Sequence, residues 1–336
     1  MLTILLLTIA CDAALDPADE PCVLATDTKV ATADGATIAL HHHGGAGEPV
    51  LMIHGISSNS RFWDLDAEHS AARWLQARGH DVWLLDLRGH GEARTTADGV
   101  PQISGWSVDD YGKYDVAAAV EHIRNVTRKP KVAIVGHSMG GMVASIYLAL
   151  GGEGSVSRIV LVGSPGTFDR EAPLVELARA GFAAGGGVLF WLETGLAADA
   201  AAMLGPMTPG RLQERLYNKD HFAPGNAERM LQRIVSPMSR QEMQQFSRMI
   251  DHERFESFDG TFSWTDRLAE VRTPVLGIAG GADEIAHPDW VQLLVESYGG
   301  PQQFVSVPGY GHLDLSLGED ADVDIWPRME AGITGR

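Results

Sequence analysis

Positive charge is scarce in this chain, and so is cysteine. There are 26 Lys and Arg against 44 Asp and Glu, which gives a formal net charge of −18. A chain with that charge repels nucleic acid and anionic membrane surfaces, so we do not expect polyanionic partners. The apolar run at residues 2–10 is also too short to cross a membrane, since a membrane-spanning helix needs about 20 residues. That run is therefore not a transmembrane segment.

The N-terminal segment lacks the Lys or Arg that usually opens an export signal, yet its apolar run has the other features of one. The run ends in Thr-Ile-Ala-Cys, which resembles a bacterial lipoprotein processing site with Cys11 as the acylated residue. We therefore expect a protein of the cell envelope that is lipid-anchored or secreted, and a cytoplasmic location is the less favoured alternative. If Cys11 is not lipidated, it can form a disulfide with Cys22 in an oxidising compartment.

Short apolar runs alternate with helical stretches from about residue 30 onward, as in an α/β protein with a mostly parallel sheet flanked by helices. Runs such as Val-Leu-Met-Ile and Val-Ala-Ile-Val lack two-residue alternation, which is typical of strands buried on both faces. The predicted strands are 37–42, 50–53, 81–85, 131–135, 158–162, 274–279 and 303–307. The predicted helices are 68–78, 108–126, 139–150, 288–298 and 322–333.

The alternation breaks once, in a stretch of helical composition that includes the predicted helices 174–204, 211–217 and 227–250. An insertion at that point of an open α/β sheet lies over the carboxyl ends of the strands, where such sheets bind ligands. The domain prediction is a core of residues 30–164 and 274–336, a helical lid of residues 165–273, and a signal-like N-terminus with its linker at residues 1–29. The apolar Phe182, Phe190 and Trp191 of the lid are predicted to bind substrate, or else to form the lid's own core.

Ser138 is the candidate nucleophile. It lies in the sequence Gly-His-Ser-Met-Gly, between a buried strand and the start of a helix. A Gly-x-Ser-x-Gly at a strand-to-helix turn forms a nucleophile elbow, because small neighbours permit a strained turn that exposes the hydroxyl. The following helix directs the positive end of its dipole at negative charge that develops near the serine oxygen.

A serine hydroxyl needs a general base, and the base needs an acid that orients it. Asp283 and His312 each follow a predicted strand, and the order Ser138, Asp283, His312 is the one expected for this kind of site. Glu284 is the fallback acid, and Asp314 is a weaker alternative. The sequence therefore predicts a Ser-His-Asp triad.

The tetrahedral intermediate of acyl transfer needs backbone donors that are already in place. The N–H of Met139 directly follows the nucleophile and is one candidate. The other is the N–H of Ile56 in the loop after the second predicted strand, with Ser57 as the alternative. Gly55 lets the backbone of this loop approach the substrate carbonyl.

Two other polar stretches are expected to have structural roles. Asp86 and Arg88 lie in Asp-Leu-Arg-Gly-His-Gly after a predicted strand, and we expect them to brace the neighbouring loops through ion pairs. The run His41–His43 lies on a strand, where adjacent side chains alternate between faces, so the three rings cannot bind one metal ion together. We expect this run to be exposed at the surface.

These motifs together resemble those of the α/β-hydrolase superfamily, apart from the lid. Within it, the sequences at 79–86, 309–314 and 323–327 look like the acid-lipase and polyhydroxyalkanoate-synthase-like branch. That resemblance implies a serine esterase or lipase acting on hydrophobic acyl substrates. The synthases carry cysteine at the nucleophile position, and epoxide hydrolases and haloalkane dehalogenases carry aspartate, whereas this chain has Ser138.

The predicted function is hydrolysis of a carboxylic ester through an acyl-enzyme, without a metal or organic cofactor. The same triad can act on a thioester, a lactone, an amide or a carbon–carbon bond, and the sequence of the lid does not separate these reactions. A non-catalytic binding protein on a hydrolase scaffold is a remote alternative, since all three triad residues are present. The expected partner is a small-molecule acyl ester, and the sequence does not indicate the oligomeric state.

Overall fold

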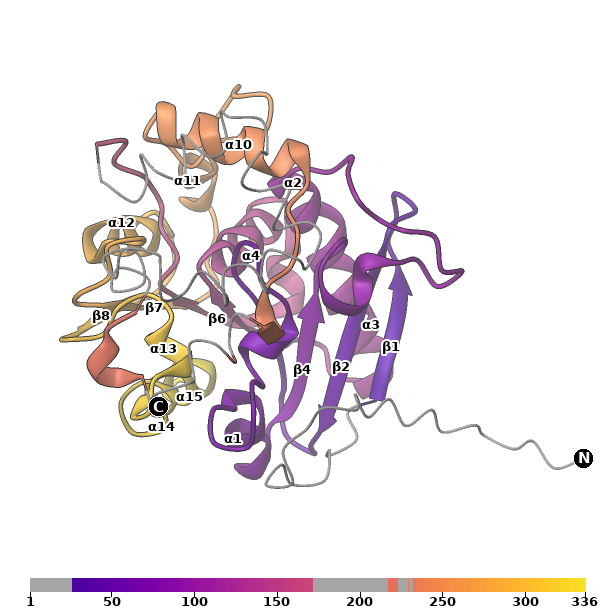
Figure 1. Ribbon diagram of the computed structural model, residues 1–336, viewed down its shortest axis with the longest axis horizontal. Helices are drawn as coiled ribbons and strands as arrows, with labels where there is room; N and C mark the ends of the chain where they lie inside the picture. Colours follow the sequence, from indigo (N-terminus) through magenta and orange to yellow (C-terminus); the bar gives the residue numbers. More distant parts are fainter. Residues whose placement is uncertain (1–25, 172–216, 223–228, 230–231) are drawn as a thin grey trace, which may run out of the picture.

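The computed structural model describes residues 26–171, 217–222, 229 and 232–336. An eight-stranded sheet runs through it in the order β1-β2-β4-β3-β5-β6-β7-β8 (Figure 1). Strand β2 pairs antiparallel with β1 and β4, and all other neighbours pair parallel, which confirms the predicted mostly parallel sheet. The strands are β1 Thr26–Ala31, β2 Thr37–Gly44, β3 Pro49–Ile53, β4 Asp81–Asp86, β5 Val132–His137, β6 Val156–Val162, β7 Val275–Gly280 and β8 Gln302–Val307.

In the described part of the chain, helices lie between successive strands from β3 onward. The α-helices are α1 Ala71–Ala77, α2 Val108–Asp110, α3 Ala117–Thr127, α4 Met139–Ala149, α10 Arg240–Asp251, α11 Trp264–Leu268, α12 Pro288–Glu296, α13 Asp314–Leu317, α14 Ala321–Asp324 and α15 Trp326–Thr334. A π-helix, η3 Tyr111–Val116, joins α2 to α3. Short 3₁₀ turns are η1 Ser60–Phe62, η2 Gly91–Arg94, η4 Gly152–Ser155 and η5 Lys219–His221.

The central strands are buried on both faces. Every residue of β3, β4 and β5 is buried. Apolar side chains of α3, α4 and α12 form one core cluster with the sheet, and those of α1 and α15 form a second cluster. Because helices cover both faces, these strands need no alternation of polar and apolar residues. This explains the uninterrupted apolar runs in the sequence.

Two local features differ from the sequence expectations. The edge strand β1 is not among the predicted strands, because its exposed residues alternate with half-buried ones and its composition is polar. Such polarity is typical of edge strands, which must avoid pairing with other chains. The predicted helix 227–250 is interrupted at residues 235–239, where Pro237 cannot continue a helix, and α10 then begins after the capping residue Ser239.

The prediction that His41–His43 is exposed is wrong. These residues belong to β2, and all three rings pair with aspartates. His41 lies 2.6 Å from Asp27 and 2.8 Å from the fully buried Asp86. The other two rings pair with Asp81 and Asp64, at 2.6 Å and 3.7 Å. The nearby carboxylates raise the pKa of His41 to about 10, against the opposing effect of its burial.

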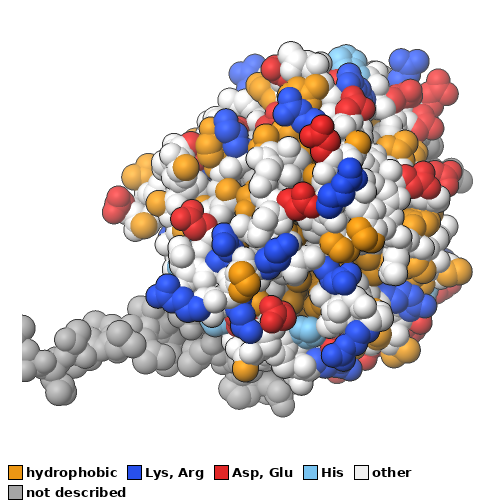
Figure 2. Space-filling view, turned by 180° about the vertical axis from the view of Figure 1, so that it is seen from behind, with side chains coloured by type: hydrophobic (Ala, Val, Ile, Leu, Met, Phe, Trp, Pro, Cys, Tyr) orange, Lys and Arg blue, Asp and Glu red, His pale blue; other side chains and the backbone are white. Residues whose placement is uncertain are grey.

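The surface has mixed charge on the face seen in Figure 2, where acidic and basic side chains are interspersed. The apolar surface there is divided among small patches. None of the helices in the described ranges has the length and apolar character needed to cross a membrane.

Candidate active site

Ser138 occupies a sharp turn between β5 and α4. Its φ of 52° and ψ of −121° lie outside the regions that non-glycine residues ordinarily adopt. The turn is so tight that a Cβ on Gly136 would collide with the backbone of Gly141. The Ser138 N–H donates to Val162 O at 2.8 Å and so ties the turn to the end of β6. This is the conformation of a nucleophile elbow.

His312 and Asp283 form a buried pair in the loops that follow β8 and β7. The His312 Nδ1 lies 2.7 Å from Asp283 Oδ2, and both side chains are almost fully buried. The second carboxylate oxygen of Asp283 accepts the N–H groups of Ile285 and Ala286, both at 2.8 Å. The carboxylate is therefore held in place from both sides and orients the imidazole ring.

The structure brings the three predicted triad residues to the same edge of the sheet. Gly163, at the end of β6, has a φ of 55°, and a Cβ there would lie 3.3 Å from His312 Nδ1. The ring of His137, which precedes Ser138, lies 4.6 Å from the ring of His312 between centroids. Among the described residues, no hydrogen bond joins Ser138 Oγ to His312. Catalytic hydrogen bonds are often long without substrate and shorten in the reacting complex.

Of the three candidate acids, Asp283 is the one hydrogen-bonded to His312 Nδ1. Glu284 is exposed on the surface of its loop. Asp314 is buried, and its carboxylate accepts the N–H of Gly311 at 2.8 Å and the N–H of Asn218 at 3.4 Å. Burial raises the pKa of Asp314. Its position supports the backbone of the histidine loop, a role that the sequence analysis did not find.

The two candidate oxyanion donors lie at the start of α4 and in the loop after β3. Among the described residues, neither the N–H of Met139 nor that of Ile56 donates a hydrogen bond. His54 is fully buried, its Nδ1 donates to Gly55 O at 2.8 Å, and its Nε2 accepts the Leu87 N–H at 3.3 Å. Because the Gly55 carbonyl and the Ile56 N–H belong to one planar peptide, His54 also fixes the direction of this N–H.

A segment of the insertion between β6 and β7 holds the same loop. The Ser236 N–H donates to Ser57 O at 3.0 Å, and Ser57 has a φ of 51°, which is strained for a non-glycine residue. The Ser236 Oγ accepts from Asn59 Nδ2 and from the Gly91 N–H, each at 3.3 Å. These contacts join residues 145 or more positions apart, and they form no local motif that sequence analysis could detect.

Helix α10 of the insertion is docked on α2 and the π-helix through a buried acid. Glu242 is fully buried, and its Oε2 accepts the hydroxyl of Tyr111 at 2.8 Å and the N–H of Ser239 at 3.1 Å. The Trp106 Nε1–H donates to the same tyrosine oxygen at 2.8 Å. Burial raises the pKa of Glu242 to about 7. This carboxyl is therefore protonated more readily than an ordinary glutamate.

Asp86 and Arg88 brace neighbouring loops, as the sequence predicts. Asp86 accepts the N–H groups of Ser60 and Glu92, at 2.7 Å and 2.9 Å, in addition to its pairing with His41. The Arg88 guanidinium pairs with the buried Asp115 and with Asp34. Neither residue contacts the triad.

Several predicted residues cannot be placed. Phe182, Phe190 and Trp191 lie outside the described residues, and so do Cys11 and Cys22. Across the ranges that the structure does describe, no group of three or more His, Cys, Asp or Glu side chains is arranged to hold a metal ion.

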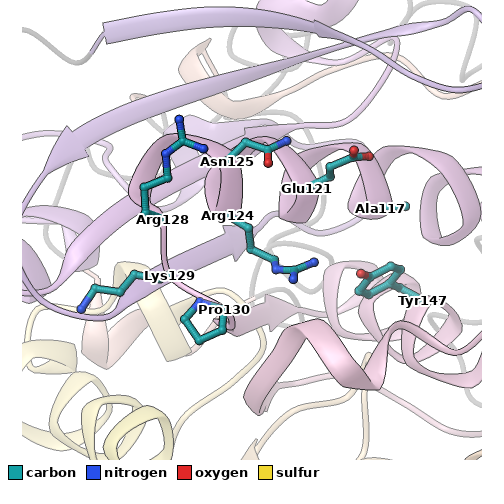
Figure 3. A pocket seen from close by; sticks show the side chains of 8 residues that line it. All are labelled: Ala117, Glu121, Arg124, Asn125, Arg128, Lys129, Pro130 and Tyr147. Carbon is teal, nitrogen blue, oxygen red and sulfur yellow. The ribbon is translucent and has the colours of Figure 1, made fainter.

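A hollow of about 590 Å³ between α3 and α4 is separate from the triad. Its lining includes Arg124, Arg128, Lys129 and Tyr147. The three basic side chains point in different directions and do not converge on one position (Figure 3). The hollow adjoins the residues before β5, whereas Ser138 follows this strand, and six strand residues span about 20 Å. This hollow is therefore not the site that holds the triad.

Comparison with protein families agrees with the observed fold. The family described as "alpha/beta hydrolase fold" matches residues 48–319, which is most of the chain. The match begins just before β3 and ends after the loop that carries His312. It therefore contains all three candidate triad residues.

Individual relatives are distant in sequence. Lipase member K of Mus musculus is 22% identical over 317 residues, covering 82% of this chain and 77% of the relative. Lysosomal acid lipase/cholesteryl ester hydrolase of Homo sapiens is 24% identical over 352 residues, covering 87% and 83%. Several other curated relatives match over less than half of their own length. An esterase structure from Exiguobacterium antarcticum superimposes with a TM-score of 0.63 at 18% identity, covering 91% of this chain and 99% of that one.

Proposed function

The chain belongs to the α/β-hydrolase fold family, and we propose that it is a serine hydrolase that cleaves a carboxylic ester. The observation that carries the proposal is the buried 2.7 Å hydrogen bond between His312 and Asp283, beside Ser138 in its elbow conformation. A nucleophilic serine requires this combination of base and orienting acid. The relatives named as lipases support an ester as the substrate class.

The proposed reaction has two acyl-transfer steps. In the first, His312 Nε2 removes the proton of Ser138 Oγ, which attacks the ester carbonyl carbon, and the oxyanion accepts hydrogen bonds from the Ile56 and Met139 N–H groups. His312 then protonates the departing alcohol and leaves an acyl-enzyme. In the second step His312 removes a proton from water, which attacks the acyl-enzyme, and His312 returns that proton to Ser138 Oγ as the acid leaves. Asp283 stabilises the imidazolium in both steps.

Other parts of the proposal are supported by the sequence alone. We propose that residues 165–273 act as a lid and that Phe182, Phe190 and Trp191 contact a hydrophobic acyl group. For residues 2–11 we propose export to the cell envelope, with attachment through lipidated Cys11. Mass spectrometry of the native N-terminus would reveal an acylated Cys11. An intact Met1 would refute anchoring through Cys11.

The test of ester hydrolysis uses p-nitrophenyl esters of increasing acyl length, with wild type beside Ser138→Ala. Loss of Ser138 should reduce kcat by a factor on the order of 10⁴ to 10⁶. Ser297→Ala is the matched control, since the hydroxyl of this serine donates to Leu293 O on the surface of α12 and its loss should leave turnover unchanged. A fluorophosphonate probe should label wild type at Ser138. If no ester is hydrolysed and the probe does not label Ser138, the proposal is wrong.

A further inference from the structure

His137 is a buried histidine for which the proposed reaction has no use. It is the last residue of β5, directly before Ser138, and its side chain is almost fully buried. Its Nε2 lies 3.1 Å from the backbone carbonyl oxygen of His312. The sequence separation between the two residues is 175 positions. This contact therefore joins the nucleophile elbow directly to the loop of the general base.

The protonation of the His137 ring follows from its partner. A carbonyl oxygen can only accept a hydrogen bond, so Nε2 must carry the proton. Burial lowers the pKa of His137 well below its ordinary value, and the neighbouring His312 ring lowers it further. The ring is therefore neutral, with Nε2 as donor and Nδ1 unprotonated. Nδ1 is buried and has no hydrogen-bond partner among the described residues.

Packing fixes the orientation of this ring. Phe62 stacks on it with a centroid distance of 4.2 Å, and Trp63 meets it edge-on at 6.3 Å. On the side of the oxyanion loop, a Cβ on Gly55 would come within 3.0 Å of His137 Nδ1 and 3.2 Å of Ser138 Cβ. The ring thus lies between the oxyanion loop and the histidine loop, and it has little room to turn.

The His312 backbone depends on this donor. In the described part of the chain, no other group donates to the His312 carbonyl. Asp283 fixes the imidazole through Nδ1. With the carbonyl held by His137 and the ring held by Asp283, the position and direction of the whole residue are determined. The remaining ring nitrogen, Nε2, is the one that must reach Ser138.

We propose that His137 is a positioning residue for ester hydrolysis, which places the general base by donating a hydrogen bond from Nε2 to the backbone carbonyl of His312. This inference rests on the proposed function. A purely structural role would depend on the volume of the His137 ring, whereas this role depends on the hydrogen-bond donor at Nε2. It also gives a chemical reason for histidine at the second position of the Gly-x-Ser-x-Gly sequence in this chain.

Two substitutions separate the donor from the packing. His137→Phe keeps an aromatic ring against Phe62 and removes the donor, whereas His137→Gln loses the ring and keeps an amide N–H at a similar reach. We expect His137→Phe to lower kcat by about 10- to 100-fold with little change in KM, because a small displacement of a catalytic group has effects of that size. His137→Gln should recover a large part of kcat. His122→Phe, which alters a half-buried ring beside Trp83, is the matched control and should retain wild-type kcat.

A measurement that does not require turnover completes the test. The proton between His312 Nδ1 and Asp283 gives a downfield NMR resonance, which is assigned by its loss in Asp283→Asn. This resonance should shift or broaden in His137→Phe and return in His137→Gln, while thermal unfolding reports whether each variant is folded. An unchanged resonance and unchanged kcat in a folded His137→Phe would overturn the inference, as would a His137→Gln variant no better than His137→Phe. If wild type hydrolyses no ester, the proposed function fails, and the resonance still decides the role of His137.

Discussion

The buried Glu242 predicts a specific dependence of stability on pH. Its pKa in the folded protein is raised to about 7 from an ordinary value of 4.5, because the carboxyl is fully buried. Below about pH 4.5 the residue is protonated in both states, so the folded state has no penalty. As the pH rises from about 4.5 to about 7, the unfolded state releases this proton while the folded state keeps it, so stability falls, and above about 7 both states are ionised and the loss is complete. A separation of about 2.5 between the two pKa values corresponds to a loss of about 3 kcal/mol.

Glu242→Gln should remove this dependence. The amide has the shape of the protonated acid, can accept from Tyr111, and places its NH₂ where Glu242 Oε1 already lacks a partner among the described residues. Urea unfolding at about pH 5 and about pH 8 should show the variant gaining about 2 kcal/mol relative to wild type over that interval. Glu270→Gln, an exposed change on the surface, is the control. A difference between variant and wild type that stays constant with pH would refute the reasoning.

Two further predictions follow from buried contacts. Arg88→Ala leaves the fully buried Asp115 without its guanidinium partner and should destabilise the protein by about 3–5 kcal/mol in urea unfolding. The double change Arg88→Met with Asp115→Asn should recover much of that loss. Equal stability of the single and double variants would contradict this account. Gly163→Ala places a Cβ 3.3 Å from the His312 ring at a φ of 55°, so kcat should fall while the variant loses about 1–2 kcal/mol of stability; an unchanged kcat would show that His312 tolerates the contact.

Most of the sheet could be predicted because its strands are apolar on both faces. Each predicted strand differs from its observed counterpart by at most two residues at either end. Strand β1 was not predicted, because edge strands need polar residues and the polar sequence of Thr26–Ala31 resembles that of a linker. The first predicted helix begins three residues late, at Ala71, because Ser70 caps it and its side chain accepts the N–H of Arg73.

The candidate site, like the fold, could be predicted only in part from the sequence. Ser138, Asp283 and His312 could be named as candidates from the sequence because glycines and strand ends mark them locally. The contacts of His137 and Ser236 could not be predicted in this way, since each depends on a partner that only the fold brings near. The run His41–His43 was misjudged for the same reason. Its aspartate partners come from three other segments of the chain, so the sequence gives no sign that the rings are paired.

The described parts of the insertion are better understood as supports of the site than as a separable cover. Ser236 holds the carbonyl of the strained Ser57 beside the candidate oxyanion donor. Asn218 donates to Gly309 O at 2.7 Å and to Asp314, which in turn holds the backbone before His312. These contacts fix the two loops whose positions the proposed chemistry needs most, the one that binds the oxyanion and the one that carries the base. The buried Asp314 carboxylate would lose one of its two N–H partners without Asn218, so the core without these segments would not keep the same loop geometry. The geometry of the sheet edge that carries Ser138, Asp283 and His312 is thus a property of the core and the insertion together.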